Sequence, residues 1–207
     1  MKSIKITVLF IAITLVTNCA SGYKMIAPKT LNYISASETE QVKIEYKYDL
    51  LDKKYAKKEV KKGVKVVATK ITNHSGKDLV FGKDAKLVYE NGTEVTIVEN
   101  ELVFKTLKQG TASYLFYLLL TPINLYTYKT SSNGGTVATN SIPIGVVLGP
   151  GLAGGNMIAA GSANKKFKEE MLEYNINGTI LKEGETTYGL IGIKANTPES
   201  LKLKIEK

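Results

Sequence analysis

Along much of the chain, apolar and polar residues alternate with a period of two. Between 42 and 49, Val, Ile and Tyr alternate with Lys, Glu and Asp, which is the pattern of a strand with one solvent-facing side. Lysines alternate with leucines in the strand expected last along the chain, and lysine on an edge strand discourages edge-to-edge pairing. Besides the first, strands are predicted over 64–73, 79–81, 85–90, 93–98, 178–181, 186–193 and 201–206.

Turn signals separate several of these strands. Asn91-Gly92 lies between two of them, and this dipeptide favours a tight hairpin because both central residues of a type I′ turn need positive φ. Lys-Glu-Gly-Glu at 182–185 is a second turn. The lysine-rich stretch 53–63 is compatible with a solvated loop, a hairpin tip or a helical turn. Short strands at this spacing predict an antiparallel sandwich.

One segment, 109–164, breaks the strand pattern, and Lys129 is its only charged residue. Its first half has an aliphatic centre with tyrosines at both ends, and its second half is rich in Gly and Ala. We predict an inserted apolar α-helical hairpin over about 110–174, whose second helix continues into a charged end. The flanking tyrosines are Tyr114, Tyr117, Tyr126 and Tyr128, and small residues four apart are Gly151, Gly155, Ala159 and Ala163.

These two residue sets give the hairpin two candidate roles. Tyrosines at both ends of an aliphatic stretch are typical of membrane interfaces, so the four tyrosines are candidate contacts with membrane or partner. Small residues four apart form a stripe through which another helix can pack closely. Fifteen helical residues, however, rise only about 23 Å against a hydrocarbon core of about 30 Å. Burial or self-association and membrane insertion both stay open; we expect packing through the stripe, sensitive to Gly155→Leu, with the tyrosine-flanked helix partly exposed.

The N-terminal residues have the pattern of an export signal. Lys2 and Lys5 precede an uncharged run over 6–16, which has the length of a signal-peptide core and is too short for a membrane span. The only cysteine, Cys19, follows where small residues usually mark cleavage. This arrangement resembles a bacterial lipoprotein signal, although Val16 and Asn18 replace the usual Leu and small residue. The resemblance implies a signal over 1–18 and a fatty acyl group, such as palmitate, on Cys19.

The remaining chain then divides into a tether and a folded domain. Residues 19–40 are mostly small and polar and predict a tether, which leaves 41–207 for the sandwich and its insertion. Segments 67–75 and 183–189, with the Asn91-Gly92 hairpin, resemble immunoglobulin-like domains of small bacterial envelope lipoproteins. The resemblance implies a mainly β fold, an immunoglobulin-like antiparallel sandwich, but such domains share no single activity.

Charge and composition limit the partners. The formal net charge is +9 at pH 7, and all 28 basic residues are lysine. Without arginine the chain lacks the planar fork that reads guanine and phosphate, so nucleic-acid binding is not expected. Loose attraction to anionic lipid or polysaccharide fits this charge, although surface lysines also simply keep a protein soluble.

No catalytic residue, metal site or cofactor is predicted. His74 is the only histidine and Cys19 the only cysteine, so neither a zinc site nor a Ser-His-Asp triad can be assembled. Glu99 and Glu101 are isolated carboxylates, and the glutamates of 169–173 are expected on a solvated helix face.

These observations predict a non-enzymatic envelope lipoprotein, anchored to a membrane through Cys19, whose sandwich acts as a binding or scaffolding module. Ala20 after the cysteine resembles an outer-membrane address in bacteria that sort lipoproteins as enterobacteria do. The alternative is an accessory subunit of a membrane assembly, such as a transporter, that docks on a protein partner through 110–174. A third hypothesis, an enzyme with a metal-free carboxylate site, would need two close, buried carboxylates in a crevice.

Overall fold

A computed structural model describes residues 19–130 and 133–206, so the predicted signal over 1–18 lies outside the described residues. The chain divides into two units. Unit 1 comprises Met1–Gly22 and Gln109–Ala163, and unit 2 comprises Tyr23–Lys108 and Asn164–Lys207. Each unit has its own cluster of buried apolar side chains.

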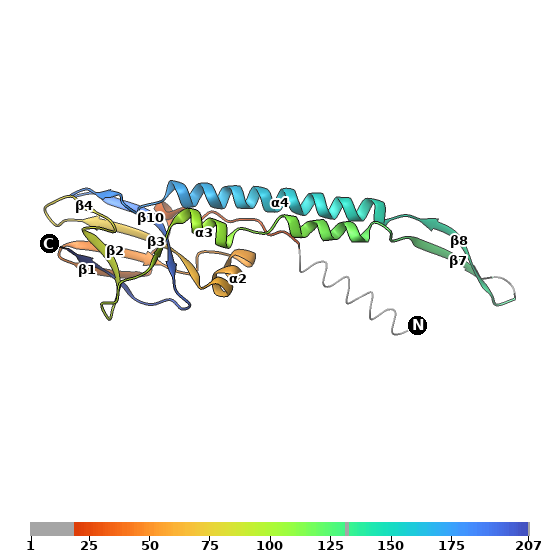
Figure 1. The fold of residues 1–207 in the computed structure, drawn as a ribbon, viewed down its shortest axis with the longest axis horizontal. Coiled ribbons are helices and arrows are strands. Elements are labelled where there is room, and N and C mark those ends of the chain that lie inside the picture. The colour runs from red at the N-terminus through yellow and green to blue at the C-terminus, as the bar shows by residue number, and fades with distance from the viewer. Residues whose placement is uncertain (1–18, 131–132, 207) are drawn as a thin grey trace. The chain divides into compact units, whose positions relative to one another are not determined.

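Unit 2 is built on an antiparallel sheet of five strands in the order β1-β2-β3-β10-β6 (Figure 1). The central strand β3 is buried along almost its whole length, so both faces of this sheet are covered. The strands are β1 (Ser35–Thr39), β2 (Val42–Lys47), β3 (Val64–Asn73), β10 (Thr186–Lys194) and β6 (Ile97–Val98).

A second layer of strands covers one face of the five-stranded sheet. It consists of the antiparallel pair β5 (Ala85–Tyr89) and β11 (Leu201–Ile205), and β11 contacts both β1 and β2. The shared core includes Ile44 and Ile71, which are paired across β2 and β3, together with Leu203 of β11. A short pair, β4 (Leu79–Val80) and β9 (Ile180–Leu181), completes this side.

Helices cover the other face. They are α2 (Lys53–Lys62), α3 (Asn100–Leu107) and the 164–173 part of α4 (Gly145–Glu173). Gly192 of β10 is required by the close approach of α3, because a Cβ there would lie 2.0 Å from Val103 Cγ2. Buried Asn100 joins three elements, since its Nδ2 donates to the carbonyls of Met171 (2.6 Å) and Leu190 (3.0 Å).

The predicted antiparallel strands are therefore present, but the predicted predominance of strand is not confirmed. The content is about 33% strand and 32% helix, and the immunoglobulin-like sandwich is likewise not confirmed. The stretch 53–63, which the sequence left open, forms α2 and ends at Gly63 with a left-handed φ of 61°. At the Asn91-Gly92 turn the Tyr89 amide donates to the Thr93 carbonyl, but the later part of this arm, β6, pairs with β10.

The predicted tether is largely folded onto unit 2. The Glu170 carboxylate accepts hydrogen bonds from the Tyr23 hydroxyl (2.6 Å) and from the amides of Ile26 (3.0 Å) and Ala27 (2.7 Å). The 3-10 helix η1 (Pro28–Thr30) follows, and then β1 pairs with β2. Glu170 is thus buried rather than solvated as predicted, because three donors replace its water.

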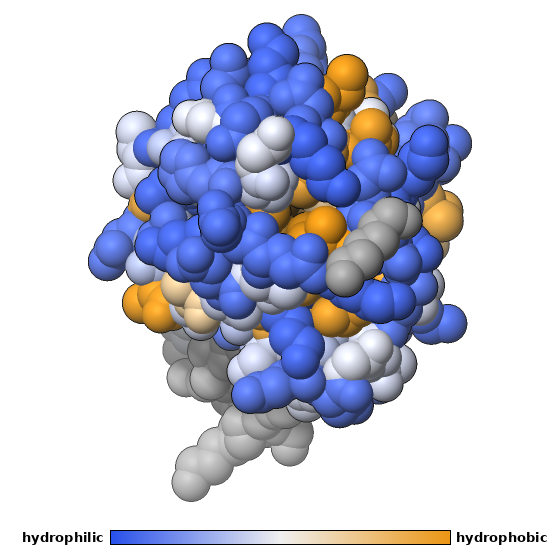
Figure 2. All heavy atoms as spheres, turned by 90° about the vertical axis from the view of Figure 1, so that its left-hand side faces the viewer, coloured by the Kyte–Doolittle hydropathy of each residue, from blue (hydrophilic) through white to orange (hydrophobic). Residues whose placement is uncertain are grey.

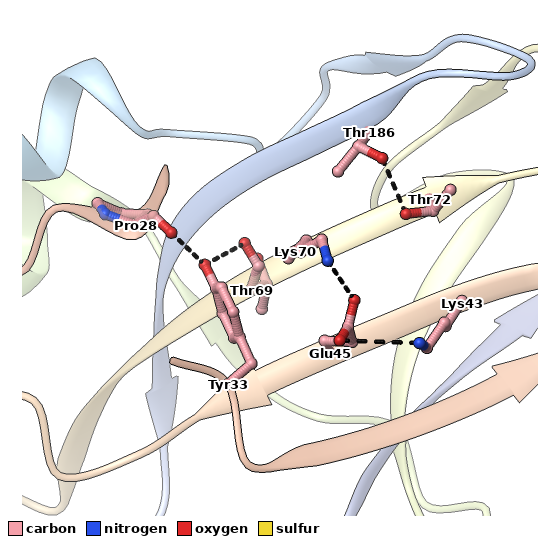
Figure 3. Close-up of polar contacts among 8 residues, drawn as sticks. All are labelled: Pro28, Tyr33, Lys43, Glu45, Thr69, Lys70, Thr72 and Thr186. Carbon is pink, nitrogen blue, oxygen red and sulfur yellow. Dashed lines mark hydrogen bonds and ion pairs between the residues drawn. The ribbon is translucent and has the colours of Figure 1, made fainter. Parts of the chain in front are cut away.

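Polar pairs across the strands fix the register of the sheet near this segment (Figure 3). Lys70 Nζ lies 2.7 Å from Glu45 Oε2, and this hydrogen bond lowers the pKa of the Glu45 carboxyl. The Tyr33 hydroxyl is 2.9 Å from the Pro28 carbonyl oxygen and 3.4 Å from that of Thr69, which links the N-terminal segment to β3.

Candidate membrane-contact surface

Unit 1 contains a 3-10 helix, a β-hairpin and most of α4. The elements are η2 (Ala112–Leu120), β7 (Leu125–Thr130), β8 (Thr136–Ile142) and residues 145–163 of α4. In Figure 1, η2 runs alongside α4, and β7 and β8 continue from their ends as a two-stranded ribbon. The predicted pair of α-helices is therefore corrected, since only the second arm is α-helical. Leu-Tyr-Thr-Tyr-Lys-Thr in β7 consists mainly of strand-favouring residues, which explains the hairpin.

In the first arm the buried side chains are three residues apart, which is the spacing of a 3-10 helix. In a 3-10 helix, residues three apart eclipse each other. Tyr114, Tyr117 and Leu120 accordingly share one side of η2, and the two tyrosine rings stack with an interplanar angle of 4°. Both tyrosines are buried, so they form the core of unit 1 rather than the predicted surface contacts.

The side of α4 that packs against η2 is a row of small residues, and this row differs from the predicted stripe. Ala153 and Ala160 are buried against the tyrosines. A Cβ at Gly145 would lie 2.1 Å from the Leu120 carbonyl oxygen. Of the predicted residues, Ala163 is buried, whereas Gly151, Gly155 and Ala159 are exposed, and a Cβ at either glycine would meet nothing within 4 Å. Packing therefore runs through the set Gly145, Gly149, Ala153 and Ala160.

The residues that carry the lipidation candidate are fixed on this unit. The Ala20 amide donates to Asn156 Oδ1 of α4 at 2.5 Å. Ser21 and Gln109 exchange two hydrogen bonds, from the Ser21 amide to Oε1 (3.0 Å) and from Nε2 to the Ser21 carbonyl (2.6 Å). Cys19 is exposed, and its thiol lies beside Tyr117. The pKa of Tyr117 is raised, first because the tyrosine is buried and then because of the neighbouring thiol.

The outward-facing side chains of residues 109–163 are almost all uncharged, and many of them are large and apolar. Every described residue of β7 and β8 is exposed, and Lys129 is the only charged residue between 109 and 163. Tyr126 and Tyr128 are exposed here, so these two predicted contacts do lie on the surface. The other exposed large apolar residues are Leu115, Phe116, Leu118, Leu119, Ile123, Leu125, Val137, Ile142, Val146, Val147, Leu148 and Ile158.

Four of these residues, Leu115, Phe116, Leu118 and Leu119, were not among the sequence-predicted contacts. The prediction chose the tyrosines because they flank an aliphatic stretch, and it assigned no side to the leucines. The sequence holds no signal that separates the two sides, because every residue from Tyr114 to Leu120 is apolar or aromatic.

Unit 2 has a different kind of surface. Figure 2 shows the end of unit 2 that lies on the left in Figure 1, and this end is mostly hydrophilic with scattered apolar side chains. Its exposed large apolar residues are few and dispersed along the sequence, as is normal for a folded domain. Most of the exposed large apolar residues of the described chain therefore belong to unit 1.

Helix α4 is, among the described residues, the one helix that is long and apolar enough to cross a membrane by length and composition. Its uncharged part, 145–163, would be about 29 Å long, close to the thickness of a hydrocarbon core of about 30 Å. Pro150 lies within it, and the residues from Lys165 onward are charged.

Unit 2 holds two buried carboxylates, each engaged by backbone amides. Besides Glu170, Glu59 of α2 accepts a hydrogen bond from the Val66 amide at 2.7 Å, and burial raises the pKa of Glu59 to about 7. His74 is exposed in its loop. In the part of the chain that the structure describes, no group of three or more His, Cys, Asp or Glu side chains could hold a metal ion.

Comparisons with protein-family models, with curated proteins and with solved structures gave no match for this chain.

Proposed function

We propose that this protein is a non-enzymatic, membrane-anchored envelope lipoprotein that places unit 1 in contact with the bilayer and presents unit 2 as a binding or scaffolding module. The observation that carries the proposal is the position of Cys19. Hydrogen bonds of Ala20 and Ser21 fix the acylation candidate on unit 1, whose residues 109–163 expose many large apolar side chains and carry Lys129 as their only charge.

The proposed acyl chain and the exposed apolar side chains of unit 1 would both contribute to the free energy of membrane binding. One acyl chain gives only marginal membrane binding, and stable anchoring takes a second signal. Full burial of a Leu or Phe side chain contributes about 1.5–3 kcal/mol, so even partial insertion of a few exposed residues of unit 1 would supply that signal.

The proposal also includes the fold of unit 2 and the membrane to which the protein is anchored. The packing of β5 and β11 against the five-stranded sheet supports a likeness of unit 2 to sandwich domains. Ala20 after the acylation site supports the outer rather than the inner membrane, in an envelope that has both.

The alternative, an accessory subunit that docks on an integral membrane protein, draws on the β7–β8 hairpin. An isolated two-stranded hairpin is marginally stable in water, and every described residue of this one is exposed. A protein partner could cover it as well as lipid could. One stoichiometric integral-membrane protein in a detergent pull-down would favour this alternative.

The anchor gives the first prediction. Mature protein is expected to begin at Cys19 and to carry acyl mass on its N-terminal peptide, whereas Cys19→Ser is expected to remain an unacylated precursor. Intact-mass and peptide mass spectrometry of membrane fractions measure both. An unmodified Cys19 thiol in the mature protein would contradict acylation.

The surface of unit 1 gives the second prediction. Protein lacking the signal and the acyl chain is expected to co-sediment with neutral phosphatidylcholine vesicles. Phe116→Gln/Leu119→Gln is expected to weaken this binding at least about tenfold, because two exposed apolar side chains no longer leave water. These residues are 73% and 74% exposed.

A matched control exists in unit 2. Ile34 and Val60 are 76% and 71% exposed, so Ile34→Gln/Val60→Gln removes equally accessible apolar surface. This variant is expected to bind vesicles like the unchanged protein. If the unit 1 and unit 2 variants lost vesicle affinity equally, or if the unchanged protein did not bind vesicles, membrane contact through unit 1 would be refuted.

A further inference from the structure

Unit 2 carries a group of lysines that converge from three helical segments. Lys58 of α2 donates a hydrogen bond from Nζ to the Lys108 carbonyl, just after α3. The ammonium groups of Lys108 and Lys168 both lie near the ring of Phe104, at 5.7 Å and 5.6 Å from its centroid. We call the set Lys58, Lys61, Lys62, Lys108 and Lys168 the basic cluster.

The cluster is not neutralised by the protein itself. No carboxylate of residues 19–130 and 133–206 forms an ion pair with any of its five members, whereas neighbouring Lys105 and Lys165 pair with Glu101 (3.1 Å) and Glu169 (3.8 Å). Like charges oppose one another here, since burial first and then nearby lysines lower the pKa of Lys58. An external anion would relieve this repulsion.

The position of the cluster along the chain indicates which anion. Lys108 immediately precedes Gln109, where unit 1 begins. Lys168 follows Ala163, where unit 1 ends, by five residues of the same helix, an axial rise of about 8 Å. That rise is within one Debye length, about 8 Å at physiological salt. Both lysines are therefore close along the chain to the two ends of the segment that is proposed to contact the bilayer.

We propose that the basic cluster binds the anionic phospholipid headgroups of the membrane that unit 1 contacts. This inference rests on the proposed function. The side-chain chemistry fits, because lysine acts as a hydrated point charge that suits laterally mobile headgroups, whereas specific phosphate recognition favours the arginine fork that this chain lacks.

The test compares phosphatidylcholine vesicles with vesicles that also contain phosphatidylglycerol, using the full mature chain without acyl groups. The unchanged protein is expected to bind the anionic vesicles more tightly and to lose the difference at high salt. Lys61→Gln/Lys62→Gln/Lys108→Gln is expected to lower affinity for the anionic vesicles by about fivefold per lysine. Its affinity for neutral vesicles should stay unchanged.

A charge-matched control separates the cluster from net charge. Lys29, Lys77 and Lys83 are exposed lysines elsewhere in unit 2, and Lys29→Gln/Lys77→Gln/Lys83→Gln removes the same charge. This control is expected to bind within about twofold of the unchanged protein, because screening limits distant charges.

The outcomes distinguish the two proposals. Equal binding to both vesicle types, or equal losses in both lysine variants, would overturn the basic cluster and leave membrane contact through unit 1 intact. Absence of binding to either vesicle type would overturn the proposed function. Lysine-dependent binding to soluble heparin with no preference for anionic vesicles would overturn the assignment to lipid.

Discussion

Glu170→Ala is expected to lower the free energy of unfolding of unit 2 by about 3–5 kcal/mol, since each buried donor left without an acceptor costs about 1–3 kcal/mol. The substitution removes the acceptor of the Tyr23 hydroxyl and of the Ile26 and Ala27 amides at once. Glu170→Gln should cost less, because its side chain keeps one oxygen acceptor.

Urea unfolding followed by circular dichroism measures this change, and hydrogen exchange locates it. The Ile26 and Ala27 amides should lose protection before the rest of unit 2. Glu169→Ala is the matched control, because Glu169 is the preceding residue of the same helix but is exposed. A cost for Glu170→Ala no larger than that of the control would contradict the assigned role.

Two alanine substitutions in α4 are expected to have opposite signs. Gly145→Ala should destabilise unit 1 by about 2–3 kcal/mol, because its Cβ would overlap backbone atoms that cannot easily move. The clash is with the carbonyl oxygens of Leu120 and Thr121, at 2.1 Å and 2.5 Å. Gly155→Ala should stabilise the helix by about 0.5–1 kcal/mol, since the position is open and alanine is the better helix former.

Hydrogen exchange over residues 112–163 and thermal unfolding of the two variants test this pair. Gly145→Ala should raise exchange in η2 and in the first turns of α4, and Gly155→Ala should lower it. Destabilisation by Gly155→Ala would instead support packing through Gly151, Gly155 and Ala159.

Sequence patterns predicted the elements that have one buried and one solvent-exposed side. Val42, Ile44 and Tyr46 are buried and alternate with more exposed residues, so the period of two survives in β2. Strand β3 was predicted with Val67, Thr69 and Ile71 on one face, but both of its faces are covered, so Val66 and Ala68 are buried as well. The helix α2 stayed undecided because lysines dominate it, and its packing depends on only a few residues, such as Tyr55.

The parts that were missed depend on contacts distant in sequence. Glu170 belongs to a run of charged residues, and its burial is determined by a segment about 145 positions earlier, around Ile26. For the candidate surface, two of the predicted contacts, Tyr114 and Tyr117, are buried, and exposed residues of η2 such as Phe116 and Leu119 were not predicted. Choosing between periods of three and 3.6 over nine residues requires knowing what lies opposite, here Ala153 and Ala160.

The docking of residues 19–40 has a consequence for how far the protein can reach. A flexible tether of this length could extend about 70–80 Å from the proposed acyl group, and unit 2 could then sample a large volume above the membrane. Residues 20 and 21 are instead bound to unit 1, and residues 23–27 to Glu170. We therefore expect that, with Cys19 acylated as proposed, residues 19–40 themselves add little to the reach of unit 2.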